Sequence, residues 1–170
     1  GKSTLLRVIA GLEEVSAGDI LIGGKRVNEV GPSGRGIAMV FQSYALYPHM
    51  TVYKNMAFNL ELSGKSKAEI DQRVRQAARM LELEPLLDRK PSQLSGGQRQ
   101  RVAIARALAL SPDLIVCDEP VSALDVLVQA QILRLLGDLQ REYGQSYLFI
   151  SHDLAVVRLI SDYVCVMKNG

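Results

Sequence analysis

The chain has 170 residues, of which 48% are hydrophobic and 22% charged, and this balance predicts one soluble globular domain with a substantial core. Its net charge is only +2 and the basic residues are mixed with acidic ones, which argues against a nucleic-acid-binding protein. No apolar run reaches the roughly 18 residues that span a bilayer, so we expect any membrane role to depend on a partner.

The sequence opens on Gly1 with neither a methionine nor a signal-peptide pattern, and we expect a fragment that lacks its amino-terminal part. Cys117 and Cys165 both lie in apolar, strand-like runs, which favours buried thiols over a disulfide or metal ligands. This use of cysteine fits a reducing, cytoplasmic setting.

In chain order the pattern alternates between helix and strand. The first half predicts a short helix between Gly1 and Gly11, a hairpin around Gly23 and Gly24, a strand at 37–41, a loop at 44–51 and helices at 52–62 and 66–81. The second half predicts a helix from about 96, a strand at 114–117, a helix from Asp125 to Gly144, a strand at 147–150, a helix at 153–160 and a strand at 163–167. Such alternation is typical of an α/β fold with a mainly parallel sheet.

One region departs from this alternation, because residues 52–87 are helical without an intervening strand. We therefore expect a helical subdomain at residues 45–104. It would be inserted into an α/β core formed by residues 1–44 and 105–170, within a single domain.

Polar residues follow three of the predicted strands. Gln42 ends the first, Asp118 and Glu119 end the second, and Ser151 with His152 ends the third. In open α/β sheets ligands bind at the carboxyl ends of the strands, so these side chains are candidates for one site. An isolated Asp-Glu pair is often only a capping or ion-paired group, and a histidine after a strand is often structural.

Two further segments suit phosphate. Gly1, Lys2, Ser3 and Thr4 match the final part of the P-loop pattern, in which backbone N–H groups and the lysine hold phosphates and the hydroxyl holds Mg²⁺. The same four residues can also occur in an ordinary loop. Residues 95–97 open a helix with small residues, and such a start exposes N–H groups and a positive dipole end to an anion.

The order of these features closely resembles the ATP-binding-cassette (ABC) ATPase family. The features are, in order, Gln42, the sequence LSGGQ at 94–98, the strand that ends in Asp118 and Glu119, and His152. The resemblance covers essentially the whole chain. The resemblance implies a P-loop NTPase core with an inserted helical subdomain, ATP and Mg²⁺ as cofactors, and ATP hydrolysis.

The resemblance also implies roles for single residues. Lys2 would bind the β and γ phosphates, with Gly1 and Thr4 beside it in the nucleotide site. The metal site would comprise Ser3, Gln42 and Asp118. Glu119 would be the general base for the attacking water, with Gln42 and His152 sensing or contacting the γ phosphate.

In the family, the LSGGQ helix start faces nucleotide held by a second subunit. Ser95, Gly96, Gly97 and Gln98 would therefore complete the partner's site in a head-to-tail dimer, and Asp125 would lie at the same interface. For Arg99, Arg101 and Arg106 we expect no more than a solvated helix face.

The implied function is the ATPase subunit of an importer, at the cytoplasmic face of a bacterial membrane. Its partners would be membrane-spanning permease subunits, docked on the loop at 44–56, and a solute-binding protein, without nucleic acid. Residues 47–58 resemble sugar-type importers whereas 118–128 and 151–158 resemble peptide-type importers, so we hypothesise a mosaic sequence joined within 94–108. The alternatives are a soluble ABC ATPase acting on nucleic acid or in translation, and a non-catalytic truncated cassette.

Overall fold

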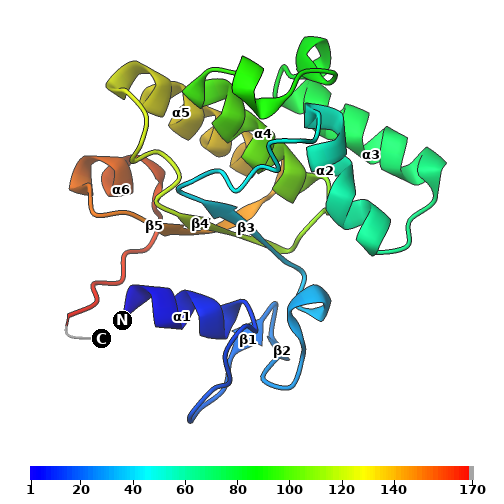
Figure 1. The fold of residues 1–170 in the computed structure, drawn as a ribbon. Helices are drawn as coiled ribbons and strands as arrows, with labels where there is room; N and C mark the ends of the chain where they lie inside the picture. The colour runs from blue at the N-terminus through cyan, green and yellow to red at the C-terminus, as the bar shows by residue number, and fades with distance from the viewer. Residues whose placement is uncertain (169–170) are drawn as a thin grey trace.

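The centre of the fold is a three-stranded parallel sheet. The structure, a computed structural model, describes residues 1–168, and Ser3 by its backbone only. Strands β3 (Ile37–Phe41), β4 (Leu114–Asp118) and β5 (Ser146–Ile150) are hydrogen-bonded in the order β3-β4-β5. Phe41 lies opposite Asp118, which lies opposite Ile150, so the carboxyl ends of all three strands meet at one edge (Figure 1). The predicted parallel sheet is confirmed.

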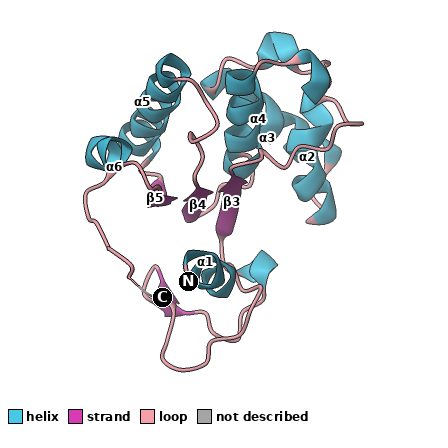
Figure 2. Ribbon diagram, turned by 60° about the vertical axis from the view of Figure 1, so that its left-hand side comes forward, coloured by secondary structure: helices cyan, strands magenta, loops and turns pink. Residues whose placement is uncertain are grey.

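Helices cover both faces of this sheet. Helix α1 (Lys2–Ile9) lies on one face, and α4 (Gly96–Leu108) and α5 (Val126–Tyr143) lie on the other, as Figures 1 and 2 both show. Helices α2 (Val52–Leu62) and α3 (Lys67–Met80) pack on α4. The remaining elements are the hairpin β1 (Leu21–Ile22) and β2 (Lys25–Arg26), α6 (Leu154–Ile160), and the 3-10 turns Pro32–Gly34, Glu84–Leu86 and Pro91–Gln93.

Polar caps and glycines define the helix ends. Five helices begin with a residue whose side-chain oxygen accepts a hydrogen bond from an N–H of the first turn. These N-cap residues of α2, α3, α4, α5 and α6 are Thr51, Ser66, Ser95, Asp125 and Asp153. Gly144 ends α5 in the left-handed conformation, with φ +65°, which a side chain would disfavour. The predicted cap at Asp125 and the predicted end at Gly144 are thus confirmed.

The core lies between the sheet and the α4–α5 layer. In β4, Ile115, Val116 and Cys117 are fully buried, as expected for a central strand of a parallel sheet. Burial raises the pKa of the Cys117 thiol to about 12, so this cysteine is a small packed side chain. On the opposite face, the buried Arg35 donates to the α1 carbonyls of Val8 and Ile9 at 2.8 Å and fixes α1 beside β3.

The strand predicted at 163–167 is wrong. This segment is irregular, with Tyr163 95% and Val166 86% exposed, and Cys165 is exposed instead of buried. The physical reason is the lack of a partner: β5 pairs with β4, and within residues 1–168 no strand pairs with its other edge. A segment with the apolar pattern of a strand cannot form a hydrogen-bonded ladder alone.

None of the helices in residues 1–168 is long and apolar enough to cross a bilayer.

The loop at 44–51 is ordered around one buried side chain. Asn55, in the first turn of α2, is fully buried. Its oxygen accepts from the Tyr47 N–H at 2.7 Å, and its amide nitrogen lies within 3.2 Å of the Tyr47, Met50 and Thr51 carbonyls. This single residue satisfies backbone groups that a side chain without polar atoms would leave unpaired.

We expect Asn55→Ala to lower the free energy of unfolding by about 2–4 kcal/mol, because buried backbone groups lose their partners. The thermal midpoint would fall by about 5–15 °C, measured by circular dichroism. Asn59→Ala is the matched control, since Asn59 lies on the same helix and makes no side-chain hydrogen bond within residues 1–168. Equal losses for both variants would contradict a special role for Asn55.

Candidate active site

Glu119 stands at the edge where the three strands end. It follows β4 directly, and its N–H donates to the Ile150 carbonyl of β5 at 3.1 Å. Its φ of +49° is unusual for a residue with a side chain and costs roughly 1–2 kcal/mol. Backbone strain of this kind is concentrated at functional sites.

Two other predicted site residues converge on the Glu119 carboxylate. Its Oε1 lies 3.7 Å from Lys2 Nζ and 3.3 Å from His152 Nδ1. Glu119 is 21% exposed, whereas Lys2 and His152 are 52% and 69% exposed. The structure therefore brings together side chains from the start of α1 and the ends of β4 and β5. Lys2 lies 117 positions before Glu119 in the sequence, and His152 lies 33 positions after it.

A small cavity adjoins this cluster. It has a volume of about 70 Å³ and is lined by Glu119 and His152 together with the loop after β4 and the start of α6. That space is large enough for a water molecule with polar neighbours. A carboxylate beside such a water can act as a general base.

The groups predicted to hold phosphate and metal border the same edge. Gly1 is the N-cap of α1, and Thr4 Oγ1 accepts from the Gly1 nitrogen at 3.4 Å, so the first turn of α1 begins at the predicted phosphate segment. Gln42 is exposed at the end of β3, and Asp118 is half-buried on the adjacent strand. The Ser3 hydroxyl lies outside the described atoms. Amide and carboxylate oxygens are the hard ligands that Mg²⁺ prefers, so this donor set fits the ion.

The signature segment, residues 94–98, lies at the start of α4. Ser95 Oγ accepts the Gln98 N–H at 3.2 Å, and Gln98 Oε1 accepts the Ser95 N–H at 2.9 Å, which is a reciprocal capping box. Gly97 is packed so tightly that a Cβ there would lie 2.7 Å from Cγ1 of Val128. Within residues 1–168, no hydrogen bond or ion pair joins the signature segment to Lys2, Glu119 or His152.

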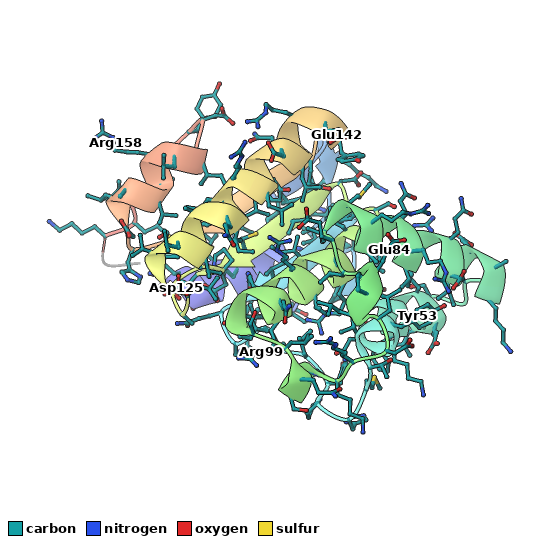
Figure 3. The ribbon with its side chains drawn as sticks, turned by 90° about the horizontal axis from the view of Figure 1, so that it is seen from above. Tyr53, Glu84, Arg99, Asp125, Glu142 and Arg158 are labelled. Carbon is teal, nitrogen blue, oxygen red and sulfur yellow. The ribbon has the colours of Figure 1, made fainter. Side chains whose placement is uncertain are left out.

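Asp125 caps the helix whose first turn packs against the signature segment, because a Cβ at Gly97 would lie 2.7 Å from Val128 Cγ1. Its Oδ1 accepts the Val128 N–H at 3.0 Å and so caps α5. Figure 3 shows Asp125 at the start of α5 and Arg99 in α4 at the same end of the molecule. Within residues 1–168, the predicted residues thus make two sets of contacts: Lys2 and His152 with Glu119, and Asp125 with the first turn of α5 that packs on Gly97.

Comparison with known proteins decides the family. A family model described as the ABC transporter matches residues 1–122. The chain belongs to this family. The sn-glycerol-3-phosphate import ATP-binding protein UgpC from Cupriavidus pinatubonensis is 53% identical over all 170 residues. The osmoprotective-compound uptake protein GgtA from Synechocystis sp. is 52% identical over the same length. The chain spans 46% and 47% of these relatives, about half of their length.

Solved ABC structures share the fold. The ATP-binding cassette MJ0796, in a dimeric post-hydrolysis state bound to ADP and Pi, aligns over 94% of this chain with a TM-score of 0.77 and 37% identity. The alignment covers 73% of that cassette. CbiO1 from Clostridium perfringens aligns over 95% of this chain with a TM-score of 0.84 and 32% identity, covering 66% of its own length.

Arg106 has a structural role that the sequence did not predict. The solvated face predicted for the α4 arginines is wrong for Arg106, which is only 8% exposed and donates to the Ala45 and Tyr44 carbonyls. The signal lies in its neighbours, since the run Val102–Leu108 is apolar around the whole helix except at Arg106. A helix that is apolar all round is buried, and a charge within it needs partners.

Proposed function

We propose that the whole protein binds ATP with Mg²⁺ at this edge and hydrolyses it to drive solute uptake. The observation that carries the proposal is the Glu119 carboxylate, held near Lys2 and His152 and next to a cavity of about 70 Å³. A base, a cation for phosphate and space for water are the parts that phosphoryl transfer to water needs.

The predicted residues at this edge then have distinct roles. Lys2 and the first-turn N–H groups of α1 bind the phosphates, because a helix start attracts anions. Ser3, Gln42 and Asp118 hold Mg²⁺, which when bound neutralises phosphate charge. Glu119 accepts the proton of the attacking water, and His152 orients Glu119 and contacts the terminal phosphate.

The second group serves a second subunit. The signature segment makes no hydrogen bond or ion pair with Lys2, Glu119 or His152 within residues 1–168, and this supports a head-to-tail dimer in which Ser95, Gly96, Gly97 and Gln98 approach the partner's nucleotide. The solved structure of MJ0796, a dimeric cassette bound to ADP and Pi, supports a dimer.

The transport role rests on the relatives. Their names describe import of sn-glycerol-3-phosphate, osmoprotective compounds and maltose or maltodextrin, which favours an importer over a nucleic-acid ATPase. We propose a subunit on the cytoplasmic face of a bacterial membrane, with permease subunits docked on residues 44–56 and a solute-binding protein supplying a sugar or peptide. The division into a core at 1–44 and 105–170 and a helical subdomain at 45–104 stays a prediction, as does the mosaic origin.

The test is phosphate release from ATP by the full-length protein, with and without Mg²⁺. Chelation should abolish release, and Lys2→Ala should weaken ATP binding by at least about tenfold, because a charge-assisted contact to phosphate is lost. Lys25→Ala, in the exposed hairpin, is the matched control and should bind ATP normally. A folded wild-type protein that binds ATP without releasing phosphate would sink the proposal.

A further inference from the structure

The turn that carries Gln42 has an uncommon backbone. We call residues 42–45 the Gln42 turn. Tyr44 and Ala45 have φ values of 61° and 47°, two consecutive residues with side chains in the left-handed region. Such a conformation is costly for any residue other than glycine and persists only where neighbouring contacts impose it. The turn therefore needs a specific stabilising partner.

Arg106 of α4 is that partner. Its Nη1 donates to the Ala45 carbonyl at 2.6 Å and its Nη2 donates to the Tyr44 carbonyl at 3.1 Å. Arg106 is 8% exposed, burial lowers the pKa of its guanidinium, and no carboxylate within residues 1–168 forms an ion pair with it. A buried charge without a counter-ion depends on its hydrogen bonds. The Gln42 turn therefore stabilises the buried guanidinium of Arg106, and Arg106 stabilises the left-handed backbone of the turn.

The first turns of α4 hold the same turn from another side. The Arg99 guanidinium lies 5.8 Å from the centre of the Tyr44 ring, a cation–π contact. A Cβ at Gly96 would lie 3.6 Å from the Tyr44 hydroxyl. The Gln42 turn is thus attached to α4 beside the signature segment and again two turns later, at Arg106.

We infer that Arg106 is a positioning residue that makes the Gln42 turn move with α4 and thereby sets the place of Gln42 at the strand ends. This inference rests on the proposed ATPase function. Nucleotide binding through Lys2 and α1 does not involve Arg106. Loss of Arg106 should therefore slow turnover and leave ATP affinity nearly unchanged.

The experiment compares Arg106→Met, Arg106→Lys and the control Arg101→Met in the full-length protein. Arg101 is on the same helix but pairs with Glu82 at 2.6 Å and does not contact the turn. We expect Arg106→Met to lower kcat at least about tenfold with a KM for ATP within about threefold of wild type, since small misplacements of active-site groups cost rate. Arg106→Lys, which keeps the charge and can reach a carbonyl, should recover part of kcat.

Hydrogen exchange provides a readout that does not require ATP turnover. In Arg106→Met, or in Arg106→Lys should the first variant not fold, the amides of residues 43–46 should exchange at least about tenfold faster while those of α1 keep their rates. Unchanged kcat and exchange, or a KM that rises as much as kcat falls, would overturn the inference. Faster exchange in a protein whose wild type has no ATPase would uphold the structural coupling and reject only the proposed function.

Discussion

Replacing Glu119 with glutamine is expected to slow ATP hydrolysis by about a hundredfold or more while ATP still binds. The amide keeps the size of the carboxylate but cannot accept a proton from water, and general-base catalysis contributes about 10²–10⁴-fold. Glu119 Oε1 also lies 3.7 Å from Lys2 Nζ. The variant removes this competing charge, so Lys2 should bind phosphate at least as well as before.

Single-turnover phosphate release and equilibrium binding of ATP measure these two effects separately. Glu142→Gln is the matched control, because Glu142 is an exposed glutamate at the opposite end of α5 from Asp125 (Figure 3) and forms no ion pair with Lys2 or His152 within residues 1–168. Its rate should equal that of the wild type. Hydrolysis by Glu119→Gln at the parental rate would remove Glu119 from its role as base.

Gly97→Ala is expected to lower ATPase activity by about tenfold or more. Gly97 has an ordinary helical backbone, so alanine itself is compatible with α4, but its Cβ would lie 2.7 Å from Val128 Cγ1. Because such a close contact cannot persist, we expect the start of α4 to shift relative to α5. A displacement of this kind takes the signature segment out of place, and misplacement by about 1 Å can cost about a hundredfold in rate.

A second substitution tests whether this contact is the cause. Val128→Ala removes the overlapping methyl, so the double variant Gly97→Ala/Val128→Ala should regain most of the lost activity, measured as a double-mutant cycle. Gly137→Ala is the control, because its nearest neighbour beyond the helix backbone is the Arg141 side chain at 3.6 Å. A double variant no more active than Gly97→Ala would mean that the glycine is needed for another reason, such as close approach of nucleotide.

Sequence patterns predicted the parts of the fold that depend on local periodicity and burial. The apolar runs of β3, β4 and β5, the cap at Asp125 and the order of elements as far as α6 matched the structure. The polar residues after the strands were predicted to share one edge, and the register of Phe41, Asp118 and Ile150 confirms this arrangement.

Features that depend on distant contacts were not predictable. Arg35 holds the last carbonyls of α1 and Arg106 holds the Gln42 turn, but the backbone carbonyls that they bind cannot be read from the sequence. The apolar run around Arg106 signals only that this side chain is buried. The left-handed backbone at Tyr44 and Glu119 carries no glycine to signal it. The residues at 163–167 have the apolar character of a strand, yet pairing partners decide whether a strand forms.

The cap at Asp125 has a mechanical consequence. Its carboxylate holds the N–H of Val128, and the side chain of Val128 contacts Gly97. In the proposed dimer, a partner subunit that displaces the Asp125 side chain would either break this cap or shift the first turn of α5, whose Val128 lies against the signature glycine. Asp125, Val128 and Gly97 would then connect the proposed dimer contact with the helix start proposed to face the partner's nucleotide. Coupling between the two nucleotide sites would then need only a shift of one helical turn.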